Sequence, residues 1–319
     1  MRLGVLDVGS NTVHLLVVDA HPGARPVHKT STKAVLRLMK YLEPDGSISD
    51  DGIERIMETM RAAAEHIAAA NLDELLPMAT SALREATNGP KLLKRIRKEC
   101  GIDLQVMSGA DEARVTFLAA RRWLGWAAGR IQLIDIGGGS LELAIGSDEL
   151  PEFAMSLPLG AGRMTKTFLT DDPPTQDELE KLQAHIDEIL PDAVAKFTEL
   201  RQPDQVVGSS KTIRSLARLA GSQVEGLGGN TMTSLYRWQL EDWMPRLAQL
   251  PSDSRHALPG ITQDRAFQIV GGGTVLLSVM RALDIEKLDV SPWAMREGVL
   301  LDYLDRLPDD SPHAKKKKK

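Results

Sequence analysis

The chain has a single cysteine among its 319 residues, Cys100, so no disulfide can form within it. This fits a reducing compartment, and we expect a cytoplasmic protein. Its most apolar stretch, Ile269–Met280, contains three glycines and falls short of the ~20 apolar residues that a membrane span needs. The first residues show no basic segment followed by an apolar core, as a secretory signal would. We therefore expect no membrane association.

The chain also has no excess of positive charge. Its 39 lysines and arginines stand against 44 aspartates and glutamates, a net charge of −5, which argues against a general nucleic-acid binder. A polyanionic substrate is still possible, because it needs only a local basic cleft. Aromatic residues are scarce as well, with five Trp, three Tyr and five Phe, so few rings can stack on a base. We expect no nucleic-acid partner.

What the chain does have is two glycine-rich turns of one design, 128 positions apart. The first is Asp7-Val8-Gly9-Ser10-Asn11-Thr12 and the second is Asp135-Ile136-Gly137-Gly138-Gly139-Ser140. Each turn follows one short apolar run and precedes another, which predicts strand, tight turn and strand. Glycine lets the backbone come close to a ligand, and successive N–H groups in such a turn cradle an anion.

The aspartate that begins each turn narrows the choice of ligand. A carboxylate cannot face a bare phosphate, so Asp7 and Asp135 make sense only with a divalent cation or a positioned water between them. A single such turn is weak evidence, because any hairpin needs glycine. Two copies indicate a duplicated domain, with the turns facing across a cleft that holds a chain of phosphates.

Strand and helix signals repeat along the chain in the order βββαβα, twice over. This order predicts an α/β protein with mixed sheets flanked by helices. We predict strands over 2–8, 12–19, 27–38, 75–80, 103–107, 130–136, 141–147, 152–157 and 286–290. We predict helices over 49–70, 88–99, 111–123, 175–199, 209–220, 231–249, 263–283 and 294–307, with a loop at Gly226–Gly229.

Further stretches give the chain a family likeness. Besides the two turns these are Ala79–Ala86, Ser108–Arg114 and Leu159–Thr165. With them the chain resembles the exopolyphosphatase / guanosine pentaphosphate phosphohydrolase (Ppx/GppA) family, within the actin–sugar kinase–Hsp70 superfamily. The resemblance runs from Asp7 to the last helix. Longer members continue into an extra helical domain, so the chain is similar to the short, two-domain form.

The resemblance implies two ribonuclease-H-like domains with the active cleft between them. We expect the first over residues 1–120, with 291–308 packing back on it, and the second over 121–290. A disordered tail is expected over 309–319. We interpret Ser291–Gly298, which matches the family's closing motif, as structural. Gly271–Gly273 is interpreted as a site of close helix packing, the alternative in the wider superfamily being room for an adenosine.

The resemblance also implies roles for individual residues. Glu112 is expected to be the catalytic residue, which accepts a proton from the attacking water or orients it. Asp111 stands where many relatives have glutamate, and we assign it to capping the helix. Arg84 is expected to bind phosphate with its bidentate fork, the alternative being a surface arginine paired with Glu85 or Glu54.

Phosphate and metal ligands complete the expected site. Ser209-Ser210-Lys211 replaces the Gly-Gly-Thr of relatives but still offers an anion site at a helix N-terminus. Asp135, with Asp7 and Glu142, is expected to hold Mg²⁺ or Mn²⁺. The expected phosphate-binding residues are Gly9, Ser10, Asn11, Thr12, Arg84, Gly137, Gly138, Gly139, Ser140, Ser209 and Lys211.

We therefore expect an exopolyphosphatase that releases orthophosphate from the ends of inorganic polyphosphate. We also expect the protein to be a homodimer. Three alternatives stay open: a guanosine pentaphosphate 5′-phosphohydrolase, a phosphotransferase that binds ATP or ADP, and a non-enzymatic nucleotide sensor. We rank polyphosphate above guanosine pentaphosphate for two reasons. Few aromatic residues are present to stack on a base, and several cationic side chains could bind successive phosphate units. The candidate cations are Arg84, Lys211, Arg37, Lys33 and Arg163.

Overall fold

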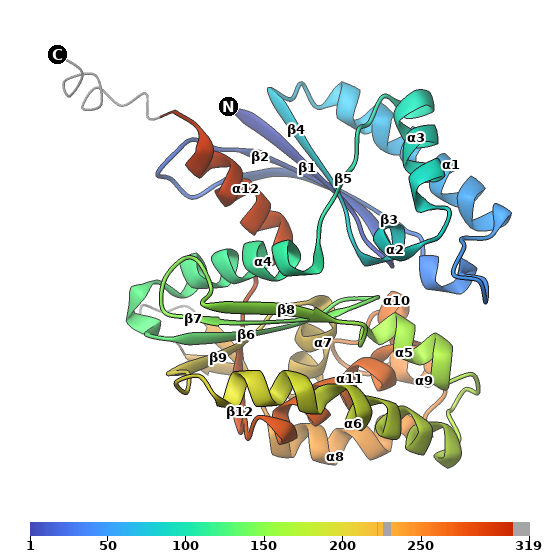
Figure 1. Ribbon diagram of the computed structural model, residues 1–319, viewed down its shortest axis with the longest axis vertical. Coiled ribbons are helices and arrows are strands. Elements are labelled where there is room, and N and C mark those ends of the chain that lie inside the picture. Colours follow the sequence, from blue (N-terminus) through green and yellow to red (C-terminus); the bar gives the residue numbers. More distant parts are fainter. Residues whose placement is uncertain (222, 226–230, 309–319) are drawn as a thin grey trace.

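The computed structural model describes residues 1–221, 223–225 and 231–308. The predicted loop at Gly226–Gly229 and the predicted tail over 309–319 lie outside the described residues. Figure 1 shows two mixed sheets, each flanked by helices, one above the other. The fold class expected from the sequence is confirmed, whereas the domain boundaries stay predictions.

The first sheet has the strand order β3-β2-β1-β4-β5. Strands β1, β2 and β3 are antiparallel neighbours, and β4 and β5 continue the sheet parallel to β1. Its strands are β1 (Arg2–Val8), β2 (Thr12–Asp19), β3 (Val27–Val35), β4 (Glu74–Ala79) and β5 (Gln105–Val106). The helices on this side are η1 (Leu38–Tyr41), α1 (Asp50–Ala69), α2 (Ser81–Glu85) and α3 (Gly89–Cys100).

The second sheet repeats this plan and extends it. Its order is β10-β11-β12-β9-β6-β7-β8, so the run β8-β7-β6-β9-β12 has the order and strand directions of the first sheet. This repetition supports the inferred duplication. The strands are β6 (Ile131–Ile136), β7 (Leu141–Gly146), β8 (Phe153–Leu157), β9 (Gln205–Gly208), β10 (Gln223–Glu225), β11 (Thr231–Tyr236) and β12 (Lys287–Val290).

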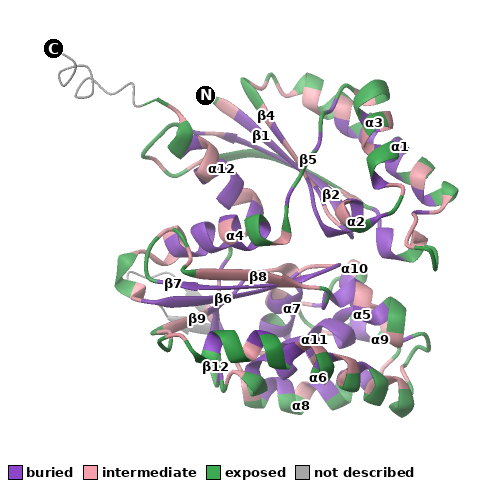
Figure 2. Cartoon of the chain, viewed as in Figure 1, coloured by how far each residue is buried: buried purple, intermediate pink, exposed green. Residues whose placement is uncertain are grey.

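The longer helices around the second sheet each bury an apolar face. Figure 2 shows β6 and β7 buried, β8 of intermediate exposure, and the outward faces of α6 and α8 exposed. The elements are η2 (Trp126–Ala128), α5 (Ala161–Phe168), α6 (Gln176–Thr198), α7 (Lys211–Ala220), α8 (Arg237–Gln249), α9 (Ser252–His256), α10 (Gln263–Ala266) and α11 (Ile269–Ala282). Within the described parts of the chain, no helix is both long and apolar enough to cross a bilayer.

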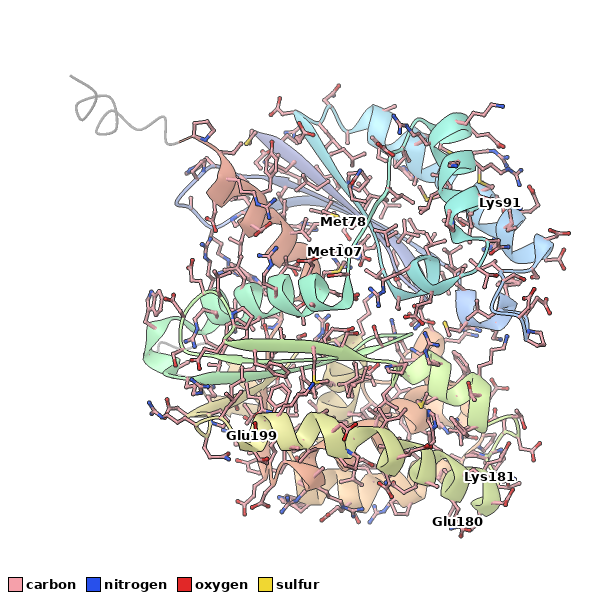
Figure 3. All side chains as sticks on the ribbon, in the orientation of Figure 1. Met78, Lys91, Met107, Glu180, Lys181 and Glu199 are labelled. Atoms are coloured by element: carbon pink, nitrogen blue, oxygen red, sulfur yellow. The ribbon has the colours of Figure 1, made fainter. Side chains whose placement is uncertain are left out.

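Two helices connect the halves, α4 (Gly109–Leu124) and α12 (Met295–Arg306). Val115 of α4 packs with α12 against the first sheet, whereas Phe117 of the same helix packs against the second sheet. Figure 1 shows α4 between the sheets with α12 beside it. Met78 and Met107 pack into the same core as α12, while Lys91 and Lys181 lie on the periphery (Figure 3).

Some predicted elements were wrong. The single helix expected over 231–249 is strand β11 followed by α8, because residues 231–233 pair with β10 and residues 234–236 pair with β12. The helix expected over 263–283 is divided into α10 and α11, and the strand expected over 27–38 ends at Val35. Helices α2 and α5 and strand β9 were not predicted, since each is short and depends on its neighbours.

The glycines of α11 serve helix packing, as interpreted from the sequence. A Cβ atom on Gly271 would lie 2.6 Å from Thr165 Oγ1 of α5. One on Gly272 would lie 2.6 Å from Thr212 Cγ2 of α7. Helix α11 can therefore lie close to both α5 and α7 only because these positions have no side chain.

Candidate functional site

The two glycine turns lie against each other where the two sheets meet. Each is closed in the same way, Gly9 N–H donating to Thr12 O at 3.0 Å and Gly137 N–H to Ser140 O at 2.9 Å. A Cβ atom on Gly138 would collide with the Asn11 amide, so the second turn fits the first only as glycine. The predicted facing of the two turns is confirmed.

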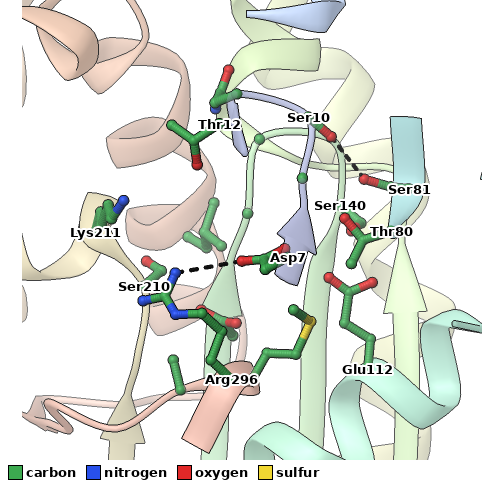
Figure 4. A pocket seen from close by; sticks show the side chains of 18 of the residues that line it. Asp7, Ser10, Thr12, Thr80, Ser81, Glu112, Ser140, Ser210, Lys211 and Arg296 are labelled. Carbon is green, nitrogen blue, oxygen red and sulfur yellow. Dashed lines mark hydrogen bonds and ion pairs between the residues drawn. The ribbon is translucent and has the colours of Figure 1, made fainter. Parts of the chain in front are cut away.

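A cavity of about 130 Å³, the site cavity, opens at this junction. Figure 4 shows residues of both halves around it, with Asp7 near the centre and the Glu112 carboxylate below Thr80 and Ser140. Eleven residues predicted for the site line it: Asp7, Gly9, Ser10, Asn11, Thr12, Glu112, Asp135, Gly137, Gly138, Ser140 and Lys211. Four others predicted for the site are not among its lining residues: Arg84, Gly139, Glu142 and Ser209.

Glu112 enters the cavity from the first turn of α4. Ser108 caps this helix, because its hydroxyl accepts the Asp111 N–H at 3.1 Å. The Glu112 carboxylate accepts a hydrogen bond from Arg84 Nη1 at 3.3 Å and is otherwise buried. Burial raises the pKa of Glu112 to about 7, and the negative charges of Asp135 and Asp7 add to this while Arg84 opposes it. A carboxyl group with this pKa can take up and release a proton near neutral pH.

Asp7, at the end of β1, faces a cation from the far end of the chain. Arg296, in the first turn of α12, places Nη1 at 3.4 Å from Asp7 Oδ2 (Figure 4). Burial raises the pKa of the Asp7 carboxyl group, and Arg296 and Lys211 lower it. The ion pair therefore stabilises a negative charge that burial alone would disfavour.

Asp135 and Glu142 are cross-strand neighbours on β6 and β7. Asp135 Oδ1 and Glu142 Oε2 are buried without a hydrogen-bond partner, although Ser156 Oγ donates to Glu142 Oε1 at 2.8 Å. Burial raises the pKa of Asp135 to about 6 and that of Glu142 well above its ordinary value, to which neighbouring carboxylates contribute. Two buried, incompletely satisfied carboxyl groups fit a divalent cation.

The donor set is nevertheless small. Among the described residues, no three histidine, cysteine or carboxylate side chains converge closely enough to hold a metal ion by themselves. A magnesium ion prefers one or two carboxylates together with waters and phosphate oxygens, so this set fits an ion that arrives with its substrate. The assignment of Asp135, Asp7 and Glu142 as ligands stays a prediction.

Positive charge lines the opposite side of the cavity. Lys211, Arg214, Arg265 and Arg296 all contribute to its wall. Lys211 is the first residue of α7, where free N–H groups and the helix dipole also favour an anion. Burial lowers the pKa of Lys211 to about 7, and neighbouring cations, Lys33 foremost, lower it further. A bound anion would restore its positive charge.

The profile of the Ppx/GppA phosphatase family matches residues 16–307. The chain belongs to the Ppx/GppA phosphatase family. The protein is therefore an enzyme of the phosphatase class. It is 48% identical over 97% of its length to Exopolyphosphatase 1 of Mycobacterium leprae, of which it covers 91%.

Solved structures of the family have the same fold. An exopolyphosphatase from Cytophaga hutchinsonii is 27% identical, with a TM-score of 0.85 over 98% of this chain and 100% of that one. The Ppx/GppA family member of Aquifex aeolicus is 25% identical, with a TM-score of 0.77 over 98% of this chain and 99% of that one. The duplicated architecture is thus the family's own.

Within this Ppx/GppA phosphatase, two assignments made from sequence need correction. Asp111 does not cap α4, since Ser108 does, and its own side chain is exposed. Ser209 is buried beneath the cavity wall, and its neighbour Ser210 lines the cavity instead. Ser210 has a positive φ of 77°, which is rare for a residue other than glycine, and its hydroxyl caps α7 by accepting the Ile213 N–H at 3.1 Å.

Arg84 lies behind the Glu112 carboxylate. It pairs with Glu112 and donates to Met107 O at 2.9 Å, while its contact with Glu85 is long at 3.5 Å. The other partner considered, Glu54, is held by Arg95. Arg84 is thus placed to orient Glu112, and its direct binding of phosphate stays a prediction.

Sequence reasoning missed three cations of the wall: Arg214, Arg265 and Arg296. Arg214 had a local signal, since it follows Lys211 by one helical turn. Arg296 belongs to the closing stretch that was interpreted as only structural, an interpretation that its contact with Asp7 shows to be incomplete. Arg265 had no signal, because it comes from α10 and reaches the cavity only through the fold.

Proposed function

We propose that this protein is an exopolyphosphatase that hydrolyses the terminal phosphoanhydride bond of inorganic polyphosphate. The observation that carries the proposal is a cavity in which two glycine turns face four cations beside one buried glutamate. Such a wall suits a phosphate chain that enters by its end. The name of the mycobacterial relative, Exopolyphosphatase 1, supports the same substrate.

The arrangement assigns a role to each group. The N–H groups of the two turns hold the terminal phosphoryl group, and Lys211, Arg214 and Arg296 offset its charge. The Glu112 carboxylate, oriented by Arg84, accepts a proton from a water molecule. The water oxygen bonds to the terminal phosphorus as the bridging P–O bond breaks, which yields orthophosphate and a chain one unit shorter.

A divalent cation, Mg²⁺ or Mn²⁺, would be held by Asp135, with Glu142 and Asp7 beside it. When bound, it would neutralise charge that develops on the phosphate oxygens. Asp135 is the best candidate because it both lines the cavity and has an unpaired carboxylate oxygen.

The catalytic role of Glu112 is tested by Glu112→Gln, which keeps size and removes the proton acceptor. We expect the kcat for orthophosphate release from polyphosphate to fall by ~10²–10⁴-fold, the usual range for a general base. Asp111→Asn is the matched control, since Asp111 adjoins Glu112 but is exposed. Near-normal turnover of Glu112→Gln would remove Glu112 from the mechanism.

The substrate is tested by comparing polyphosphate, guanosine pentaphosphate and ATP with the same orthophosphate assay. We expect kcat/KM to be highest for polyphosphate and to require a divalent cation. A clear preference for guanosine pentaphosphate would make the protein a 5′-phosphohydrolase of the same family. Phosphoryl transfer from ATP to an acceptor, without release of orthophosphate, would make it a kinase.

A further inference from the structure

A second hollow of about 350 Å³, the outer hollow, adjoins the site cavity. Lys211, Arg214 and Arg265 belong to the walls of both, so a phosphate chain held in the site cavity can extend into the outer hollow. Both halves of the molecule build it: Lys33 comes from β3 of the first sheet and Arg218 from α7.

The charge of the outer hollow favours an anion. Five cationic side chains line it: Lys33, Lys211, Arg214, Arg218 and Arg265. His14, also in the wall, adds no charge, because burial and the neighbouring cations Arg296, Lys211 and Lys33 lower its pKa to about 3. Among the described residues, no aromatic ring other than this imidazole lines the hollow. A nucleobase would therefore find little to stack on, whereas phosphate units would find cations.

One carboxylate, Asp264, stands among these cations. Lys33 Nζ lies 2.6 Å from Asp264 Oδ2, and Thr262 Oγ1 donates to Asp264 Oδ1 at 2.6 Å. Arg265 Nε is a more distant neighbour at 3.8 Å. Burial opposes the charge of Asp264, but Lys33, Thr262 and Arg265 outweigh it and hold the pKa well below its ordinary value. The carboxylate thus stays ionised and connects β3 to α10 across the hollow.

Arg265 shows that the cation set is incompletely paired. Its side chain is only 8% exposed, and its Nε atom has no hydrogen-bond partner. A buried guanidinium without full pairing is costly, so an anion in the hollow would be stabilised by it. Of the described residues in the wall of the hollow, Asp264 alone carries a negative charge.

We infer that Asp264 is a specificity-determining residue, a built-in counter-anion for which longer phosphate chains must compete. Phosphate units that reach the outer hollow have to draw Lys33 and Arg265 away from the Asp264 carboxylate and accept its repulsion. A chain that fits within the site cavity can meet Arg265, whose contact with Asp264 is the longer one at 3.8 Å, but does not meet Lys33, which lines only the outer hollow. Asp264 therefore weakens the binding of long chains selectively. This inference rests on the proposed function.

The test is Asp264→Asn, which keeps the size of the side chain and removes its charge. For long polyphosphate we expect KM to fall by roughly three- to tenfold, as for release of one partly buried charge pair, with kcat unchanged. For tripolyphosphate, which does not reach Lys33, we expect a much smaller fall in KM and an unchanged kcat. Asp253→Asn is the matched control, because Asp253 is exposed on the neighbouring helix α9 and does not line the hollow.

A second variant makes the competition itself measurable. Lys33→Gln should raise KM for long polyphosphate, and should do so more strongly when Asp264 is already asparagine, since Lys33 is then free for the substrate. An unchanged KM in Asp264→Asn would overturn the inference. A higher KM would also overturn it, because Asp264 would then be positioning the cations rather than competing for them.

Equilibrium binding separates this inference from the proposed function. The dissociation constants of tripolyphosphate and long polyphosphate are measured in EDTA for the parent protein and Asp264→Asn. If the parent binds both chains in EDTA but releases no orthophosphate when Mg²⁺ is supplied, the proposed function fails, and the ratio of dissociation constants still decides the role of Asp264. If long chains gain clearly more affinity in the variant than tripolyphosphate does, the inference stands.

Discussion

Glu112 is a carboxyl group whose surroundings make it a weak acid. It lies in a buried position between the negative charges of Asp135 and Asp7, and only Arg84 favours its ionised form. The same side chain on the helix surface would be ionised throughout the neutral range and would hold protons too weakly to act as an effective base. Burial of the first turn of α4 therefore gives this residue the proton affinity that its proposed role requires.

The pH dependence of turnover follows from this pKa. A general base works only when it is unprotonated, so kcat should rise with pH through about 7 and then level off. Replacing Arg84 by Gln removes the charge that favours ionised Glu112, and should move the rise to higher pH. We would measure kcat from pH 5.5 to 9 for both proteins. An apparent pKa near the ordinary value of glutamate would contradict the role.

The buried negative charge of Asp135 lowers the stability of the folded state, whereas a neutral residue at this position would not. Its pKa is raised by burial to about 6 from the ordinary 3.8, so the folded state holds its proton more tightly than the unfolded state. A raised carboxyl pKa lowers stability as pH rises from about 4 through about 6, and the loss is complete above that. The difference corresponds to ~3 kcal/mol at pH 8.

Asp135→Asn should therefore stabilise the metal-free protein at pH 8 by up to ~3 kcal/mol, and by much less at pH 4, which is close to the ordinary pKa of 3.8 that applies to the unfolded state. Urea unfolding in EDTA at the two pH values measures this gain. If Asp135 is a cation ligand, the variant should also need more Mg²⁺ for half-maximal activity. If the variant and the parent are equally stable at pH 8, the charge of Asp135 does not destabilise the fold. If the Mg²⁺ titration of activity is unchanged, Asp135 is not a cation ligand.

At the scale of elements, the crossing of α4 and α12 places two parts of the site at once. Helix α4 carries Glu112 and α12 carries Arg296, and the two helices touch where Gly298 meets Val115. A Cβ atom on Gly298 would collide with the Val115 carbonyl oxygen, a backbone atom that cannot swing aside. The distance between the helices is therefore set by a missing side chain.

Gly298→Ala should force α12 away from α4. We expect a loss of roughly 1–3 kcal/mol in stability, the usual cost of overpacking, together with a higher KM because Arg296 moves with its helix. Thermal unfolding and steady-state kinetics measure the two effects. If the variant is as stable as the parent, a Cβ atom at position 298 fits between α4 and α12 without displacing either helix.

At the scale of the whole molecule, the cations matter more than the net charge. A protein with net charge −5 gathers Lys211, Arg214, Arg265 and Arg296 around one cavity. These residues come from three helices of different parts of the chain. The fold thus builds a local positive field that composition conceals.

This gathering predicts a steep salt dependence. KM for long polyphosphate should rise markedly between low and moderate ionic strength, because several ion contacts are screened together. KM for tripolyphosphate should rise less, since fewer contacts are involved. Kinetics at 25 and 200 mM salt would decide this. A KM for long polyphosphate that does not respond to salt would mean that the cations do not line its path.

The sequence by itself determined the features that depend on neighbouring residues. The turns at Asp7–Thr12 and Asp135–Ser140, their flanking strands and most long helices follow from local rules of glycine and apolar periodicity. The resemblance to its family placed Glu112 beside these turns before any contact was known. Strand β11 escaped these rules because its state depends on pairing with β10 and β12.

Only the tertiary structure decided which charges meet. Arg296 reaches Asp7 from 289 positions away, and Lys33 reaches Asp264 across 231 positions. It also placed Arg84 behind Glu112 rather than in the cavity wall. No local pattern encodes such pairs, because a single arginine or aspartate looks alike on a solvated face and in a site. Their roles arise when folding buries them together, where charges interact far more strongly than in water.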